Sequence, residues 1–306
     1  MNTELKYINY EIKKSSQRFI SSVNQRYCSH LFNIVDDISS HKNERPIILI
    51  SGPSGSGKTT TALMIEKILD EMGLETHTFS MDNYFRPLSE EEQILAANGK
   101  MDLESPQRVD GEFLSTQLQA ILDCEPIELP KYNFKTSSRV GSGKTFQRKP
   151  GELVILEGIH ALNPDVISLQ DDGLSKIYVS VRTRITHNQK ILHPSKIRLM
   201  RRMIRDNKFR KRSFEETLKM FKNVEAGENL YIMPYKYRST YDVDTFLDYE
   251  ICAYRNLLIE EFNNLSDNTI IQDIMTFLEH AAPIELSEIP RDSLICEFIG
   301  NGQFKY

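Results

Sequence analysis

Residues 52–59, GPSGSGKT, have the types and spacing of a loop that binds phosphate groups. Gly52 and Gly57 are five positions apart and are followed by Lys58 and Thr59, which completes the pattern GxxxxGK[ST]. Glycines let backbone N–H groups close around an anion, the lysine amine reaches the outer phosphates, and the threonine hydroxyl ligates Mg²⁺. The sequence therefore predicts a nucleotide site that also holds Mg²⁺.

The flanking residues predict the strand and the helix that such a loop connects. Residues 45–51, RPIILIS, form a short β-branched run typical of a buried parallel strand. Apolar residues recur at helical spacing from Ala62 to Met72, and Gly73 then ends the pattern, so the loop opens a helix whose N-terminus attracts anions. We assign these residues to the nucleotide site: Gly52, Ser54, Gly55, Ser56, Gly57, Lys58, Thr59 and Thr60.

The pentapeptide GSGKT occurs a second time, at residues 141–145. Here the residue five positions before Gly143 is Ser138, so the full pattern is missing, and Pro150 with Gly151 blocks a following helix. We predict that residues 136–151 form a polar turn or loop. A contact between Lys144 and an anion is the minor alternative.

Two carboxylates end predicted strands near the phosphate-binding loop. Asp82 closes ETHTFSMD, and Glu157 lies directly after the apolar run LVIL and before Gly158. An acid in such a position holds Mg²⁺ through water or orients an attacking hydroxyl group, the two tasks that phosphoryl transfer needs beyond charge neutralisation. The alternative for each is a solvated acid at a strand end. We predict that Glu157 is a metal ligand together with Thr59.

Residues 196–212, KIRLMRRMIRDNKFRKR, contain nine basic side chains. A mobile lid of this kind would supply positive charge to transferring phosphates. A solvated helix face and a nucleic-acid patch are the alternatives, and the overall net charge of −5 weakens the second. His187 and His193, just before this segment, are expected to be loop residues. The candidate arginines of the lid are Arg198, Arg201, Arg202, Arg205 and Arg212.

The composition is typical of a globular protein, with 40% hydrophobic and 26% charged residues among 306. Cys28, Cys124, Cys252 and Cys296 show no metal-ligand spacing, which predicts free thiols in a reducing compartment. No run approaches the roughly 18 apolar residues of a membrane span, and the polar start is unlike a signal peptide. We expect a cytoplasmic protein that binds neither membranes nor nucleic acids, and we leave homo-oligomerisation open.

Predicted strands and helices alternate through residues 46–265, which indicates an α/β fold with a parallel sheet flanked by helices and ligands at the carboxyl ends of the strands. Residues 1–45 have the apolar spacing of one or two amphipathic helices and form an N-terminal helical extension. The lid would span about 183–240, and residues 266–306 would add a helix and a tail packed on the core. The strands are predicted at 46–51, 75–81, 153–157, 176–181 and 241–246, and the helices of the main domain at 59–72, 111–123, 195–207, 213–226 and 248–264.

Six segments occur in the order and approximate spacing of the uridine kinase and phosphoribulokinase group of P-loop kinases: GPSGSGKTT, MDNYFRP, DLESP, LPKYNFKTSSR, LVILEGIHAL and RLMRRMIRDNKFRKRS. The chain most resembles bacterial uridine kinase-like nucleoside kinases, without the TGS domain that some of them carry. The resemblance covers roughly 46–265, and the tail IPRDSLICEFIGNG is also similar to theirs. It implies a five-stranded core of the P-loop NTPase type, ATP with Mg²⁺ as donor, and a nucleoside 5′-hydroxyl as acceptor.

The resemblance also implies roles for individual residues. Asp82 is similar to the catalytic base, Glu157 to the acid that holds the metal, and Glu104 to the carboxylate that binds the ribose hydroxyls. Tyr132 and Phe134 would line the base pocket. The basic segment would supply the lid, with Arg201 at the substrate and with Arg205 and Arg212 at the transferring phosphate.

Three positions depart from the pattern of this group. Phe85 takes a tyrosine position, Glu104 replaces an aspartate and has Asp102 nearby as a rival, and Ser137 stands where uridine and cytidine kinases have a histidine that reads the pyrimidine. The reaction type survives these changes, whereas the identity of the base is open. The alternatives to a nucleoside kinase are a kinase for a phosphosugar or a pantothenate-like alcohol, and a nucleotide-binding regulatory ATPase.

Overall fold

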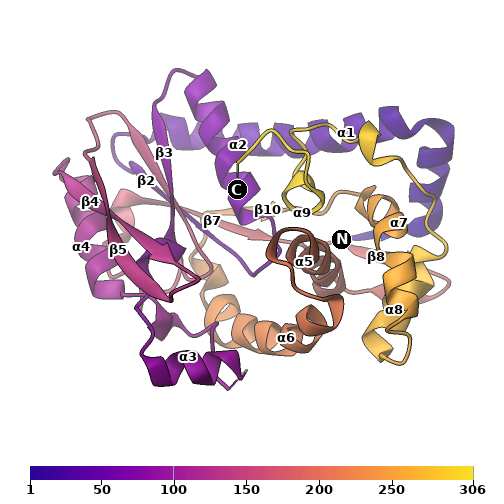
Figure 1. Ribbon diagram of the computed structural model, residues 1–306. Helices are drawn as coiled ribbons and strands as arrows, with labels where there is room; N and C mark the ends of the chain where they lie inside the picture. Colours follow the sequence, from indigo (N-terminus) through magenta and orange to yellow (C-terminus); the bar gives the residue numbers. More distant parts are fainter. Residues whose placement is uncertain (99, 306) are drawn as a thin grey trace.

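The computed structural model describes residues 1–98 and 100–305 and has a five-stranded parallel sheet at its centre (Figure 1). The strand order across the sheet is β10–β7–β2–β6–β3. The sequence IILIS of β2 is buried at every position because β2 lies in the middle, between β6 and β7. The predicted fold class is therefore confirmed. The strands of this sheet are β2 (Ile47–Ser51), β3 (Thr76–Ser80), β6 (Leu153–Glu157), β7 (Leu174–Ser180) and β10 (Tyr241–Asp244).

Helices cover both faces of the sheet because alternate side chains of β2 enter different cores. Ile48 and Ile50 pack with α1, α2 and the helices of the C-terminal half, whereas Ile47 and Leu49 pack with α4. The longer helices are α1 (Leu5–Ser40), α2 (Lys58–Glu71), α3 (Glu90–Ala97), α4 (Gly111–Leu122), α5 (Pro194–Arg210), α6 (Phe214–Gly227), α7 (Glu250–Asn263) and α8 (Thr269–Leu278).

The N-terminal extension is one long helix with a kink. Ser15 of α1 has φ −171° and ψ 101°, so the first turns change direction before the helix continues along α2 (Figure 1). The buried side of α1 carries the apolar residues that the sequence places at helical spacing. The Tyr27 hydroxyl also forms a 2.8 Å hydrogen bond with Thr61 Oγ1 of α2. The extension thus contacts the helix that follows the phosphate loop.

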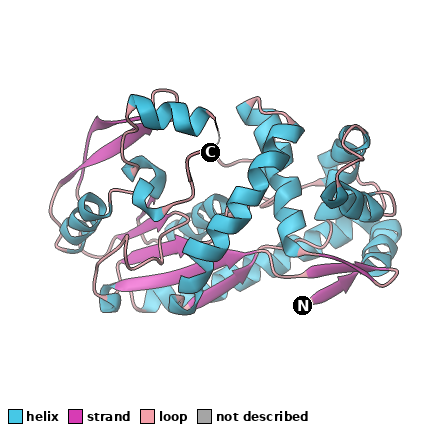
Figure 2. Cartoon of the chain, turned by 90° about the horizontal axis from the view of Figure 1, so that it is seen from below, coloured by secondary structure: helices cyan, strands magenta, loops and turns pink. Residues whose placement is uncertain are grey.

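Short strands lie at both ends of the molecule, outside the central sheet. β1 (Asn2–Glu4), β8 (Arg184–His187) and β9 (Lys190–Leu192) form a small sheet beside the N-terminus (Figure 2).

A π-helical turn (Glu228–Ile232) and a 3₁₀ helix (Met233–Arg238) connect α6 to β10. The tail ends in the one-turn helix α9 (Cys296–Ile299).

The second GSGKT lies in a β-strand, so the prediction of a turn or loop over 136–151 is wrong for most of that range. β5 (Ser138–Phe146) pairs antiparallel with β4 (Ile127–Asn133), which provides partners for its backbone groups despite its polar sequence. Gly141 is opposite Pro130, and a Cβ atom on it would lie 2.2 Å from Glu128 Oε1. This glycine therefore allows close packing across the hairpin.

The predicted strands and helices of the main domain are present with bounds that shift by a few residues. The helix α3, the β4–β5 hairpin and the small sheet were not predicted. All four cysteines are free, as expected. Within residues 1–98 and 100–305, no helix combines the length and apolar character needed to cross a bilayer.

Candidate functional site

The phosphate-binding loop connects the end of β2 to the start of α2. A Cβ atom on Gly52 would lie 1.9 Å from the carbonyl oxygen of Val179, so only glycine allows β7 to approach so closely. Gly57 has φ +88° and directly precedes the first turn of α2. The loop therefore directs the N–H groups of a helix N-terminus toward one point, which is the arrangement that binds phosphate.

Lys58 lies buried at the start of α2, with 8% of its surface exposed. Its amine donates to the Pro53 carbonyl oxygen at 3.4 Å. Burial lowers the pKa of Lys58, while nearby Glu157, Glu297 and Asp82 favour its charged form. The amine is thus a cation surrounded by carboxylates within the loop.

Glu157 is the last residue of β6, and Asp82 lies in the short 3₁₀ helix (Met81–Tyr84) that directly follows the neighbouring strand β3, so both carboxylates lie at the edge of the sheet that carries the phosphate loop. Burial raises the pKa of Glu157 to about 7, against the charge of Lys58. Surrounding protein atoms likewise raise the pKa of Asp82, although its side chain is exposed and Lys58, Arg210 and Arg205 oppose the shift. Both carboxylates therefore have an increased affinity for protons.

Several arginines share a single buried carboxylate beside this site. Asp206 is fully buried and accepts hydrogen bonds from Arg205 at 2.8 and 3.0 Å and from Arg212 at 3.3 Å, with Arg210 also 3.3 Å away. Burial would raise the pKa of Asp206, but the guanidinium groups outweigh it and hold the pKa below its usual range. One carboxylate does not balance these cations, and the excess positive charge acts on Asp82.

Arg202 connects the basic helix to the phosphate loop. Its Nη1 donates to Ser54 Oγ, and its buried Nε has no hydrogen-bond partner among the described residues. Burial and the neighbouring Arg205 lower the pKa of Arg202 to about 10. Arg198 Nη1 also donates to the Ser54 carbonyl oxygen, at 3.2 Å. The helix α5 thus already contacts the loop.

Arg201 differs from the other arginines of the segment because its side chain is 0% exposed. It forms two hydrogen bonds with Glu250, at 2.8 and 3.0 Å, and its other N–H groups reach carbonyl oxygens of Gly55, Ser56 and Thr245. Arg201 therefore fixes the phosphate loop to the core. The sequence predicts that Arg201 contacts the substrate, but in this structure its side chain exposes no surface to one.

Glu104 lies in the loop before α4, within electrostatic reach of Lys58 and Arg202. Burial raises its pKa, against the charges of Arg202 and Lys58. A Cβ atom on Gly227 would be 2.4 Å from Glu104 Cβ, so the end of α6 packs directly on this side chain. The rival Asp102 instead accepts a 2.9 Å hydrogen bond from the Tyr231 hydroxyl. Glu104 is therefore the carboxylate of this pair that faces the phosphate loop.

The predicted aromatic residues form one cluster with Phe85. The ring centroids of Tyr132 and Phe134 are 5.1 Å apart, and those of Phe85 and Tyr132 are 5.6 Å apart. Tyr132 is buried and its hydroxyl accepts from Arg108 Nη2 at 3.2 Å, whereas Phe134 is 65% exposed. Ser137 lies in the adjacent hairpin turn with φ +48°. The cluster is an apolar surface with one polar atom that is already bonded.

Two residues that lie at the site, His160 and Glu297, were not predicted from the sequence. His160 is buried, and its Nε2 donates to the Glu104 carbonyl oxygen at 2.9 Å. Burial lowers the pKa of His160 to about 4, and its Nδ1 has no partner among the described residues. Glu297 of α9 accepts hydrogen bonds from Thr60. His160 follows the strand-end Glu157 closely in sequence, which is a usable signal, but no local pattern marks Glu297.

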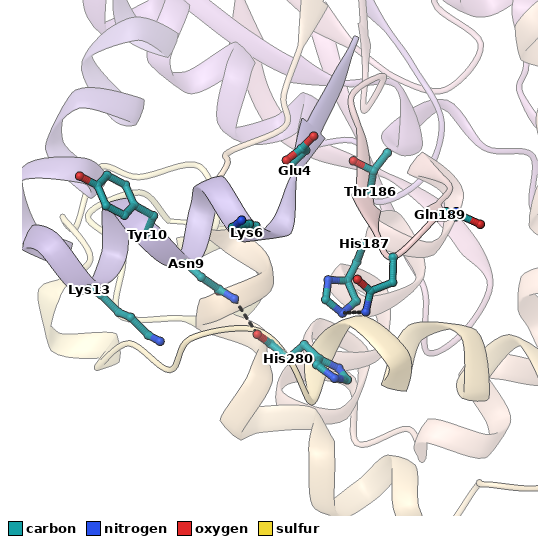
Figure 3. Close-up of a pocket in the computed structure, with 10 residues that line it drawn as sticks. Glu4, Lys6, Asn9, Tyr10, Lys13, Thr186, His187, Gln189 and His280 are labelled. Atoms are coloured by element: carbon teal, nitrogen blue, oxygen red, sulfur yellow. Dashed lines mark hydrogen bonds between the residues drawn. The ribbon is translucent and has the colours of Figure 1, made fainter.

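A separate pocket of about 590 Å³ lies between the start of α1, the β8–β9 turn and the end of α8 (Figure 3). His187 and His280 pack with ring centroids 4.6 Å apart, and Asn9 Nδ2 donates to the His280 carbonyl oxygen at 2.7 Å. Burial and the neighbouring His280 lower the pKa of His187. None of the residues assigned to phosphate transfer lines this pocket.

Comparisons with known proteins agree with this geometry. The model of the phosphoribulokinase/uridine kinase family matches residues 47–248. A uridine kinase from Lactobacillus johnsonii is 31% identical over 199 residues, which cover 64% of this chain and 84% of that protein. A uridine kinase from Lactobacillus helveticus is 33% identical over 202 residues, with the same coverage. The fold is similar to that of a putative fructose transport system kinase from Silicibacter sp. TM1040, with a TM-score of 0.50, 15% identity, and coverage of 69% of this chain and 98% of that one.

Proposed function

Because the chain belongs to the phosphoribulokinase/uridine kinase family, we propose that it transfers the γ-phosphate of ATP to the 5′-hydroxyl group of a nucleoside. The observation that carries this proposal is the set of charges around Lys58. Asp82 follows β3 and Glu157 ends the adjacent strand β6, both within electrostatic reach of this amine, and a group of arginines lies beside them. Phosphoryl transfer needs these parts, since catalysis depends on positioning and on neutralising charge.

The loop and the basic helix are proposed to hold the donor. N–H groups from Gly55 to Thr60 would surround the phosphates, and Lys58 would neutralise the outer ones. Arg205 and Arg212 exceed the charge of the carboxylate that they share, so incoming phosphates would find cations not fully paired. Charge that develops during transfer would be stabilised by the same groups.

The residues present fit a magnesium ion. Thr59 offers a hydroxyl and Glu157 a carboxylate, and oxygen donors of this kind are those that Mg²⁺ prefers. Burial raises the pKa of the Glu157 carboxyl although Lys58 lies within electrostatic reach, so a further cation beside this carboxyl would favour its charged form. A bound Mg²⁺ supplies charge neutralisation on the donor phosphates.

Asp82 is proposed to act as the general base. Its carboxylate would accept the proton of the 5′-hydroxyl while that oxygen forms a bond to the γ-phosphorus, and the bond from that phosphorus to ADP breaks. The raised pKa of Asp82 makes it a stronger base than an aspartate with the usual pKa. Glu104 would orient the acceptor through its ribose hydroxyls, and Tyr132 and Phe134 would pack against the base.

The test is release of ADP from ATP in the presence of candidate acceptors. We expect nucleosides to stimulate release and a nucleoside 5′-monophosphate to appear, as identified by mass spectrometry. Stimulation by a phosphosugar or a pantothenate-like alcohol alone would indicate a different acceptor class. Slow hydrolysis that no acceptor stimulates would indicate a regulatory ATPase. Lys58→Ala is the control, because it removes the amine that contacts the phosphates.

A further inference from the structure

We infer that Glu297 holds the phosphate site closed against the donor: its carboxylate occupies hydrogen-bond donors of Thr60 that a nucleotide phosphate takes over on binding. Glu297 Oε2 accepts from the Thr60 hydroxyl at 2.6 Å and from the Thr60 backbone N–H at 3.3 Å. This inference rests on the proposed function, since it assumes that the loop binds a nucleoside triphosphate.

Thr60 lies in the first turn of α2, where N–H groups bond outside the helix, as the N–H of Thr60 does with Glu297. A carboxylate and a phosphate are both acceptors and both anions, so they compete for the same N–H and hydroxyl groups and for the same helix dipole. In loops of this pattern, these backbone groups cradle the α- and β-phosphates. Glu297 therefore occupies a position that the donor requires.

Glu297 also adds charge to the site. It is close enough to favour the charged forms of Lys58 and Arg201, and it helps to raise the pKa of Glu157. A third carboxylate near Lys58, besides Asp82 and Glu157, repels an incoming phosphate. Displacement of its side chain would restore the positive potential of the loop.

Residues 290–303, which we call the C-terminal clasp, hold Glu297 in place. The clasp closes on itself through a 2.8 Å hydrogen bond from Gln303 N–H to the Arg291 carbonyl oxygen. Leu294 packs on Gly57, where a Cβ atom would be 2.9 Å from its Cδ1. Lys208 of α5 donates to the Ile299 carbonyl oxygen at 2.5 Å. The backbone of the clasp is thus anchored to the loop and to the basic helix, so the inference requires only the half-buried Glu297 side chain to move.

The test compares nucleotide affinity and stability in Glu297→Gln, which keeps the shape and removes the charge. We expect Kd for a non-hydrolysable ATP analogue with Mg²⁺, measured by calorimetry, to fall about tenfold, because a charged hydrogen bond no longer competes. Asp292→Asn removes a carboxylate from an exposed position of the same clasp and should leave Kd within about twofold. An unchanged or higher Kd in Glu297→Gln overturns the inference.

Melting temperatures distinguish a Glu297 that competes with the nucleotide for Thr60 from a Glu297 that only stabilises the start of α2. If the contact exists only without nucleotide, Glu297→Gln lowers Tm of the free protein and leaves Tm at saturating analogue equal to that of wild type. Equal losses in both states overturn the inference. Should Glu297→Gln fail to fold, Glu297→Asp provides a shorter carboxylate, for which a smaller fall in Kd is expected and an unchanged Kd counts against the inference.

The donor site itself is checked independently with Lys58→Ala. If this variant binds the analogue as tightly as wild type, the proposed donor site is wrong. If Lys58→Ala loses binding while Glu297→Gln gains none, the donor site stands and only the role of Glu297 is overturned.

Discussion

Arg201 of α5 and Glu250 of α7 form an ion pair in which both side chains are 0% exposed. The two hydrogen bonds that join them measure 2.8 and 3.0 Å, and Arg201 Nη1 reaches the carbonyl oxygens of Gly55 and Ser56 at 3.3 Å. The pair therefore fixes the phosphate loop to two helices of the C-terminal half. Its role is to position the loop, and it leaves no donor free for a ligand.

Removal of this arginine should affect folding more than binding. Arg201→Met leaves the Glu250 carboxylate unpaired in the interior, so we expect the free energy of unfolding in urea to fall by about 3–5 kcal/mol. Arg205→Ala is the matched comparison within α5. Its carboxylate partner keeps two other arginines, so we expect a smaller loss of stability and a fall in kcat/KM of about ten- to a hundredfold. The reverse ranking of the two variants would contradict this assignment.

The two GSGKT copies predict opposite results for their lysines. Lys58→Ala should abolish turnover, since the amine neutralises charge that grows during transfer, an effect of several kcal/mol in the barrier. Lys144 is exposed on β5, far from the loop in sequence, so Lys144→Ala should leave kcat and KM nearly unchanged. Equal damage from both substitutions would show that the second copy also serves the reaction.

Asp82→Asn isolates the chemical step. The amide keeps the shape of the side chain and removes the proton acceptor, so we expect kcat to fall by about a hundredfold or more with little change in ATP affinity. Steady-state kinetics and direct nucleotide binding measure the two effects separately. Survival of kcat would exclude Asp82 as the base and direct attention to Glu104.

His160 should make stability depend on pH. Its pKa is about 4 in the folded protein and about 6.5 when unfolded, so between these values the unfolded chain binds a proton that the folded protein does not. The free energy of unfolding should therefore fall as pH falls, by about 1.4 kcal/mol per pH unit from this group. Urea titrations at pH 6 and pH 5 should show that His160→Gln lacks this part of the dependence. An equal dependence in both proteins would mean that His160 is not the group responsible.

A helix or strand could be predicted from the sequence where its own apolar residues recur at the spacing of that element. The strand at 153–157 has the predicted bounds because LVIL is buried on both sides. The hairpin escaped prediction because β5 is a polar strand, SRVGSGKTF, whose pairing with β4 provides what its own sequence does not signal. Strand formation there depends on a partner, which a single segment does not reveal.

The residues of the candidate site likewise fall into those that a local sequence pattern predicts and those that only the folded chain brings together. The phosphate loop and the strand-end acids could be predicted because chemistry and position coincide within a few residues. The burial of Arg201 could not, since a helix with many basic residues is read as a solvated face, and its partner Glu250 is 49 positions away. Glu297 is 237 positions from Thr60, so only the folded chain brings the two together.

The last prediction concerns the acceptor base and rests on Ser137. A histidine at this position can hydrogen-bond to the edge of a pyrimidine. The serine side chain is shorter by several atoms, so its hydroxyl does not reach as far. The nearby aromatic cluster offers Phe85 and Phe134, which have no polar atom, and Tyr132, whose hydroxyl already accepts from Arg108. A pocket of aromatic surfaces discriminates between ligands by roughly ten- to a hundredfold, far less than a pocket that hydrogen-bonds its ligand.

We therefore expect broad tolerance of the base, with at least one purine nucleoside within about a hundredfold of uridine in kcat/KM. The measurement compares uridine, cytidine, adenosine, guanosine and inosine in the ADP-release assay. Ser137→His is the matched variant: residue 137 has φ +48°, which histidine adopts more readily than most residues, and the substitution should shift selectivity toward the pyrimidines. A preference of wild type above about a thousandfold for both pyrimidines over every purine would mean that another side chain, such as Arg108, supplies the contact that Ser137 lacks.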